Sequence, residues 1–177
     1  YQTGDALYSA YGAVQFAKQA FTAGTNLVDY QNQLSDCADS LSRMGQILAP
    51  QWLAMNLQTT QNFRETLPDP DELRGAYFDE DEWLPNAIAA NDMSGRNFHS
   101  VCKLLLGYHF DVDDRLEKYA REAEDLRGGG KGNTPLAQFY FYFSLSKLRL
   151  AVVNGTKNDP GIMNSVNPYL QLINIWS

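Results

Sequence analysis

The sequence predicts an all-α protein, a single-domain helical bundle of about six or seven helices over residues 1–177, arranged as antiparallel helical hairpins. Three observations lead to this fold class. Apolar side chains recur every three or four residues over most of the chain, as they do on one face of an α-helix. Proline and glycine divide these periodic stretches into helix-sized segments. The first two segments are separated by a very short connection, which favours antiparallel neighbours.

The clearest periodic stretch spans residues 27–48 and predicts one long helix that ends at Pro50. The positions between the apolar ones are mostly polar, so the stripe must be buried by other helices. The apolar positions are Leu27, Tyr30, Leu34, Cys37, Leu41, Met44 and Leu48.

A helix over residues 5–23 precedes this stretch, with Thr3 as its N-terminal cap and Gly24 as its stop. Because only Gly24 and Thr25 separate the two helices, we expect them to form the antiparallel pair on which the bundle is built. The predicted inward face of the first helix consists of Leu7, Tyr11, Val14 and Phe21.

The remaining chain predicts five more helices. The aromatic run 139–143 alone would suit a strand, but its apolar spacing continues helically to Val153. A glycine-rich stretch at 128–133 is expected to be a flexible linker. The five helices are expected between Pro50 and Pro68, from a cap at Ser94 to His109, over 112–127 with Asp111 as cap, over 134–153, and after Pro168.

Residues 68–93 lack a clear period and hold most of the charge of the protein. Six of the seven net negative charges fall between Asp69 and Glu82. Tyr77, Phe78 and Trp83 are interspersed among these acids, so we expect an acidic, partly irregular segment that docks on the helices. The spacing of the acids does not match a helix-loop-helix calcium site.

Composition limits the classes of partner. The net charge of −7 argues against nucleic acid, and no apolar run approaches the roughly 20 residues that span a bilayer. Residue 1 is Tyr rather than Met, so we expect a processed or partial chain. The abundance of Asn and Gln relative to Lys favours an extracytoplasmic protein, secreted or periplasmic.

The two cysteines, Cys37 and Cys102, both lie on apolar stripes. One interpretation is two buried thiols, and the other is a single disulfide formed in an oxidising compartment.

No catalytic or cofactor-binding motif is recognisable, so we expect no cofactor and favour a protein that is not an enzyme. His99, Cys102 and His109 lie on one helix at offsets of three and ten residues. A metal site there would need further ligands, such as carboxylates. A metal-dependent enzyme that uses His99 and His109 is therefore the third functional hypothesis.

The leading hypothesis is a non-enzymatic protein-binding domain, as in immunity or adaptor proteins, that recognises a basic partner. Acids mixed with aromatic side chains combine electrostatic steering with anchors for an interface. The expected contact residues are Asp69, Asp71, Glu72, Tyr77, Phe78, Asp79, Glu80, Asp81, Glu82 and Trp83. The alternative is a carrier of a small apolar ligand in a cavity between helices, lined by Phe139, Tyr140 and Phe143.

Overall fold

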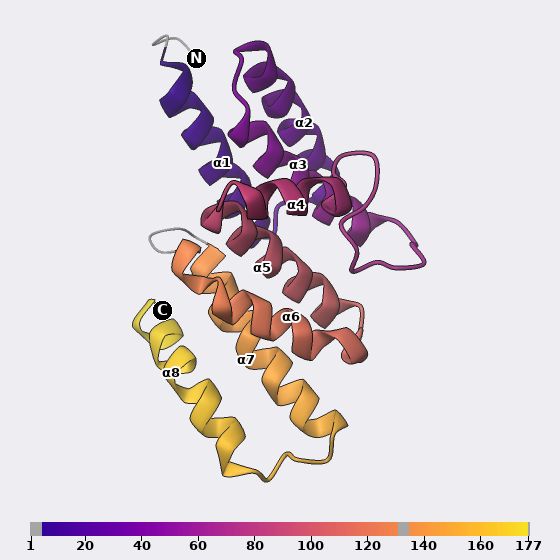
Figure 1. Cartoon of the computed structure of the whole chain (residues 1–177), viewed down its shortest axis with the longest axis vertical. Helices are drawn as coiled ribbons and strands as arrows, with labels where there is room; N and C mark the ends of the chain where they lie inside the picture. The colour runs from indigo at the N-terminus through magenta and orange to yellow at the C-terminus, as the bar shows by residue number, and fades with distance from the viewer. Residues whose placement is uncertain (1–4, 131–134, 177) are drawn as a thin grey trace. The chain divides into compact units, whose positions relative to one another are not determined.

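A computed structural model describes residues 5–130 and 135–176 (Figure 1). The described residues form eight α-helices and one short 3-10 helix, with no strand, which confirms the all-α prediction. The α-helices are α1 (Ala6–Thr22), α2 (Leu27–Arg43), α3 (Leu48–Arg64), α4 (Glu80–Ala89), α5 (Met93–His109), α6 (Asp113–Asp125), α7 (Pro135–Val153) and α8 (Pro160–Trp176). The expected number of six or seven was too low because α4 forms inside the acidic segment that was expected to be irregular. None of the described helices is long and apolar enough to cross a membrane.

The chain divides into two compact units, Tyr1–Pro85 (unit 1) and Asn86–Ser177 (unit 2), and the division falls within α4. Unit 1 contains α1, α2 and α3, and unit 2 contains α5 to α8. The expectation of one domain over the whole chain stays a prediction.

In unit 1, α1, α2 and α3 run up and down beside one another (Figure 1). Tyr30 of α2 is fully buried at their centre. Its hydroxyl lies 2.9 Å from the carbonyl oxygen of Ala17 and 3.2 Å from the side-chain oxygen of Asn56, so it joins all three helices. The buried apolar residues around it are Ala10, Val14, Ala17, Leu34, Leu41, Leu53 and Leu57.

The inward face of α1 differs from the one predicted. Ala10, Val14 and Ala17 are buried, whereas Leu7 and Tyr11 are more than half exposed. Small alanine side chains allow α1 to approach its neighbours closely. Because α1 turns its alanine face toward α2 and α3, the larger side chains on the adjoining face are exposed to solvent. Asp5 caps the helix by accepting hydrogen bonds from two backbone N–H groups, and the predicted cap Thr3 lies outside the described residues.

The long helix predicted over 27–48 is two helices, because a turn at Gly45 separates α2 from α3. Gly45 has φ +73°, in the left-handed region that favours glycine. The N–H of Gln46 donates to the carbonyl of Leu41 and that of Gly45 to the carbonyl of Ser42, which is the Schellman pattern of a helix end. Pro50 therefore does not end a helix but lies in the first turn of α3, where its missing N–H costs nothing.

Unit 2 is built around α7, which is helical throughout the aromatic run. It packs on α5, α6 and α8. The buried apolar cluster includes Phe139, Phe143, Leu104, Leu116, Ala120, Ala123 and Tyr169. Arg149 of α7 forms ion pairs with Asp111 and Asp113 at the start of α6, and the hydrogen bond it donates lowers the pKa of the Asp113 carboxyl.

Several helix ends in unit 2 differ from the prediction. The cap of α5 is Asp92 rather than Ser94, and Asp111 binds Arg149 instead of capping α6. The last helix, α8, begins at Pro160 and contains Pro168, so it is much longer than predicted.

The glycine-rich stretch is not an open linker where the structure describes it. Residues 127–130 form a 3-10 helix packed on α5, while residues 131–133 lie outside the described residues. A Cβ atom added at Gly129 would lie only 2.1 Å from the carbonyl oxygen of Met93, so close packing requires glycine here.

Leu34 and Leu41 are fully buried, so replacing either by Ala should lower the free energy of unfolding by about 2–5 kcal/mol. Replacing exposed Asn32 or Gln33 of the same helix should change it by less than about 0.5 kcal/mol. Urea denaturation of the four variants measures both effects. Equal losses in the two groups would contradict the assigned buried face of α2.

Two glycine variants should have opposite effects on stability. Gly45→Ala places a side chain at a left-handed position and should destabilise the protein by about 1–2 kcal/mol. Gly12→Ala lies within α1, where an added Cβ meets no atom within 4 Å, and should stabilise by about 0.5–1 kcal/mol. Thermal denaturation compares the two, and a stabilising Gly45→Ala would contradict the turn described here.

Candidate functional site

The predicted acidic segment is held on α3 by two buried amide side chains. Asn62 is fully buried, and its Nδ2 donates to the carbonyl oxygens of Pro70, at 2.9 Å, and Glu72, at 2.7 Å. Gln58 donates to Asn62 at 2.8 Å and accepts from the backbone N–H of Tyr77 at 3.2 Å. The backbone of residues 70–77 is therefore fixed by α3.

Several of the predicted contact acids bind groups within the segment itself. Glu80 is buried, and its carboxylate accepts the N–H of Leu73 at 3.3 Å. Arg74 forms ion pairs with Glu72, at 3.1 Å, and Asp81, at 2.9 Å. These contacts neutralise part of the charge that the sequence places here.

The acid run also forms the beginning of α4. The side chain of Asp79 accepts the backbone N–H of Asp81 at 2.9 Å, as a capping residue does. Glu80, Asp81 and Glu82 occupy the first turn, where the helix dipole favours negative charge. Asp71 is fully buried. The exposed carboxylates of the segment are those of Asp69, Asp79, Asp81 and Glu82.

One aromatic side chain of the segment contacts α2, and the other two pack on each other. Phe78 is buried and packs on half-buried Trp83, with ring centroids 5.5 Å apart. The Tyr77 hydroxyl accepts a 2.6 Å hydrogen bond from Gln31 of α2. Tyr77 is thus the aromatic residue of the three that is most open to solvent.

The structure does not gather the histidines and cysteines into a site. His99 and Cys102 are buried on α5, whereas His109 is exposed and its Nδ1 lies 2.9 Å from the carbonyl oxygen of Leu105. Within the described ranges, no three His, Cys, Asp or Glu side chains are grouped to hold a metal ion. Cys37 is half-buried in unit 1 and Cys102 is buried in unit 2, so the disulfide considered from the sequence would join the two units and stays a prediction.

The predicted ligand residues of α7 are occupied by their own packing. Phe139 and Phe143 are buried with ring centroids 5.3 Å apart, and Phe143 meets the edge of Tyr169 at 4.9 Å. Tyr140 stacks on the Tyr169 ring, with the centroids 5.3 Å apart. These rings form part of the core of unit 2.

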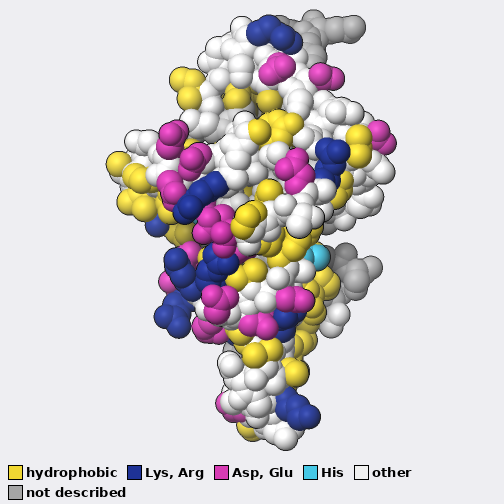
Figure 2. Space-filling view, turned by 90° about the vertical axis from the view of Figure 1, so that its right-hand side faces the viewer, with side chains coloured by type: hydrophobic (Ala, Val, Ile, Leu, Met, Phe, Trp, Pro, Cys, Tyr) yellow, Lys and Arg dark blue, Asp and Glu magenta, His cyan; other side chains and the backbone are white. Residues whose placement is uncertain are grey.

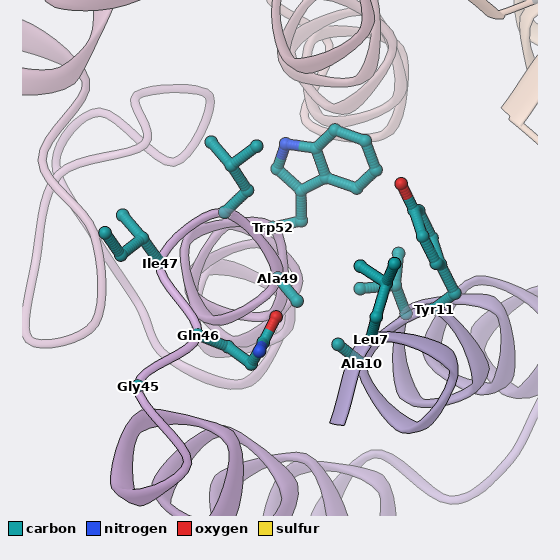
Figure 3. Close-up of a pocket in the computed structure, with 10 residues that line it drawn as sticks. Leu7, Ala10, Tyr11, Gly45, Gln46, Ile47, Ala49 and Trp52 are labelled. Atoms are coloured by element: carbon teal, nitrogen blue, oxygen red, sulfur yellow. The ribbon is translucent and has the colours of Figure 1, made fainter. Parts of the chain in front are cut away.

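An apolar pocket lies instead in unit 1, between the first half of α1 and the start of α3 (Figure 3). Its volume is about 280 Å³. We call its lining residues the apolar site: Leu7, Ala10, Tyr11, Val14, Gly45, Gln46, Ile47, Leu48, Ala49 and Trp52.

Two aromatic rings and one amide define the interior of the apolar site. The rings of Tyr11 and Trp52 project from α1 and α3 toward the same space, and the Gln46 amide lies between the two helices (Figure 3). The ammonium group of buried Lys18 lies 4.8 Å from the Trp52 ring centroid, a cation–π contact that helps to fix the indole. The site therefore has aromatic walls and few polar groups.

The rim of the apolar site is exposed to solvent. Leu7, Tyr11, Ile47 and Leu48 are 55%, 56%, 72% and 62% exposed. The face drawn in Figure 2 shows acidic and basic side chains interleaved, with hydrophobic side chains reaching the surface between them. Large apolar side chains grouped around a pocket are a feature of binding surfaces.

Sequence reasoning missed the apolar site because it placed Leu7, Tyr11 and Leu48 in the core. A signal was present in α1, where large residues at 7, 11 and 14 and small residues at 10, 13 and 17 form two neighbouring stripes. One helix face cannot bury both stripes against the same pair of neighbours. Gly45 was the second signal, because a glycine followed closely by Pro50 is typical of a helix end and a new start.

Comparisons with known proteins add no assignment: no protein-family model, curated protein or solved structure matches this chain.

Asn62→Ala should release the acidic segment from α3. The carbonyl oxygens of Pro70 and Glu72 would lose a buried donor, at a cost of about 1–3 kcal/mol in the free energy of unfolding. Amide hydrogen exchange over residues 70–77 should become faster, while exposed Asn32→Ala should leave it unchanged. Unaltered exchange in the Asn62 variant would contradict the role of this amide.

Proposed function

We propose that this protein is a non-enzymatic protein-binding domain and that unit 1 binds its partner at the apolar site. The observation that carries this proposal is a pocket surrounded by large, solvent-exposed apolar side chains. An apolar side chain of the partner enters the pocket, and the surrounding partner surface covers the rim.

The size of the pocket favours a side chain over a larger free ligand. Its volume of about 280 Å³ lies just below the usual range for small-molecule sites, about 300–1,000 Å³. It is also open rather than enclosed, because four of its lining residues are more than half exposed. A carrier of a small apolar molecule normally buries most of its ligand.

The exposed area around the pocket also favours a protein partner. If a large apolar side chain has on the order of 150–200 Å² of surface, the exposed fractions of Leu7, Tyr11, Ile47 and Leu48 correspond to roughly 400 Å². That is about half of the roughly 800 Å² that one partner contributes to a standard protein interface. A small molecule in the pocket would leave most of this area in water.

The chemistry of the lining is also typical of an interface. Tyr11 and Trp52 belong to the residue types that are enriched where binding energy is concentrated. The lining has no charged residue, so a partner does not have to desolvate an ion there.

The acidic segment is a second candidate for partner binding. Its exposed acids and Tyr77 lie within one short stretch of sequence, in which α3 holds the backbone of residues 70–77. A basic partner would be attracted by this charge, with a strong dependence on salt. We rank it below the apolar site because much of its charge and two of its three aromatic rings have structural roles.

A photoreactive crosslinker tests the proposal directly. Benzoylphenylalanine in place of Tyr11, irradiated in an extract of the native source, should give adducts with the mass of a polypeptide. The same crosslinker at exposed Gln33 of α2, outside the apolar site, is the matched control and should give far fewer. Leu48→Glu in the Tyr11 crosslinker variant should abolish the adducts, because it places a charge on the apolar rim.

Mass spectrometry of the adducts separates the alternatives. Polypeptide adducts that require Leu48 support protein binding at the apolar site. Adducts with a small molecule alone would favour the carrier function, and equal labelling from Tyr11 and Gln33 would mean that the apolar site has no special role.

A further inference from the structure

The turn between α7 and α8 contains a sequence motif that the proposed function does not use. Asn154-Gly155-Thr156 has the form Asn-x-Ser/Thr, with a middle residue other than proline, which is the acceptor motif of N-linked glycosylation. It is the only match to this motif in the sequence. Because a motif of three residues is short, it carries weight only where the fold presents its asparagine to solvent.

The fold presents this motif to solvent. Asn154 is the first residue after α7, and all positions from 152 to 161 are exposed except the motif's own backbone contacts to the helix end. An oligosaccharide is bulky and polar, so its acceptor must lie on the surface of the folded chain. The turn meets this requirement at each of the three motif positions.

The turn does not depend on the side chain of Asn154. The N–H of Gly155 donates to the carbonyl of Val152 at 3.1 Å, and the N–H of Thr156 donates to the carbonyl of Ala151 at 2.8 Å. Gly155 has φ +69°, so α7 ends in the same way as α2. These main-chain contacts close the turn, and the side-chain amide of Asn154 takes no part in the hydrogen bonds of the described residues.

Other asparagines of the chain have structural roles that a sugar would disturb. The buried amide of Asn62 holds the acidic segment, and the side chain of Asn26 accepts backbone N–H groups at the start of α2. A sugar on the amide nitrogen replaces one N–H and adds bulk. At Asn154 this replacement removes no internal hydrogen bond, so the folded chain tolerates it there.

Two apolar side chains next to Asn154 give the modification a physical effect. Val152 and Val153, at the end of α7, are 66% and 55% exposed. An oligosaccharide attached to the following residue adds hydrated groups beside this apolar surface. Glycans on surface turns increase solubility, and exposed apolar patches reduce it.

We propose that Asn154 is an N-glycosylation site. The co-substrate is an oligosaccharide joined through pyrophosphate to a lipid. The Nδ2 atom of Asn154 forms a bond to C1 of the first sugar, and the bond between that C1 and the phosphate oxygen breaks. The amide nitrogen releases one proton to solvent, the lipid pyrophosphate leaves, and nothing is oxidised or reduced.

The proposal goes beyond the proposed function and does not depend on it, because the motif lies in unit 2 and the apolar site in unit 1. The transferase and the lipid-linked donor belong to the compartment through which the chain passes. The proposal therefore agrees with the extracytoplasmic localisation that the sequence analysis favours.

Peptide mapping of the full chain from its native source tests the proposal. Trypsin cleaves after Arg149 and Lys157, so residues 150–157 form one peptide that contains the whole motif. Most of this peptide should have a mass higher than its sequence predicts. Its fragmentation in the mass spectrometer should give sugar ions, together with peptide fragments that retain one sugar residue on Asn154.

Variants expressed in the same source identify the acceptor. Asn154→Gln and Thr156→Ala should remove the sugar completely, because each destroys the motif, whereas Thr156→Ser should retain it. Asn158→Gln, at an exposed position of the same turn but outside the motif, is the matched control and should be modified like the wild type. Circular dichroism of the four variants confirms that they are folded.

Three results would overturn the proposal. An unmodified peptide 150–157 as the main form in the native protein would exclude glycosylation at Asn154. A peptide in which Asn154 is merely hydrolysed to Asp, a spontaneous reaction of exposed Asn-Gly pairs, would exclude it as well. Sugar that persists in Thr156→Ala would show that the motif is not what the transferase recognises. None of these results changes the crosslinking expected from Tyr11, so the two proposals are tested separately.

Discussion

The left-handed turn at Gly45 is the constraint on which the architecture of unit 1 depends. A φ of +73° ends α2 at Arg43 and allows the chain to reverse within four residues. If the helix continued to Leu48, as the apolar spacing alone predicts, Met44 and Leu48 would extend the buried stripe. The reversal instead places Ile47 and Leu48 in the lining of the apolar site, so the same glycine that forms the hairpin also exposes one wall of that site.

The position of α1 follows from the sizes of its side chains. Ala10 and Ala17 let its backbone approach α2 and α3, and the Tyr30 hydroxyl contacts the backbone of Ala17 directly. A closer approach gains contact along the alanine face, and the larger Leu7 and Tyr11 on the adjoining face are left in solvent. The apolar site is thus a consequence of close packing elsewhere on α1.

The sequence is informative about the fold and much less informative about the site. Periodicity located seven of the eight α-helices that the structure describes, and the continued spacing to Val153 correctly favoured a helix over a strand for the aromatic run. It failed for α4, where Pro85 and a run of acids conceal the helix. In that segment the acids cap the start of the helix and occupy its first turn. This role depends on backbone N–H groups, whose positions composition does not reveal.

Long-range polar contacts were equally inaccessible to sequence reasoning. Asn62 and Gln58 read as ordinary polar residues of a helix, yet both are buried and hold a segment 8 to 19 residues further along the chain. Their partners are mostly backbone groups, which have no sequence signature. The composition of the acidic segment therefore suggested a binding surface. The buried amides of α3 account instead for how the backbone of the segment is held in place.

Two exposed apolar surfaces have a common physical origin in helices that are apolar on more than one side. In α1 and α7, one set of apolar side chains is buried within its own unit, and a second set, which includes Leu7, Tyr11, Phe141 and Val152, meets solvent. Stability of each unit requires only the first set, because the core is complete without Leu7, Tyr11, Phe141 or Val152. Exposure of these side chains to water adds nothing to the stability of the folded chain. Exposed apolar patches are typical of interaction sites. A surface that contributes little to folding and favours contact is the physical basis of the proposed binding function.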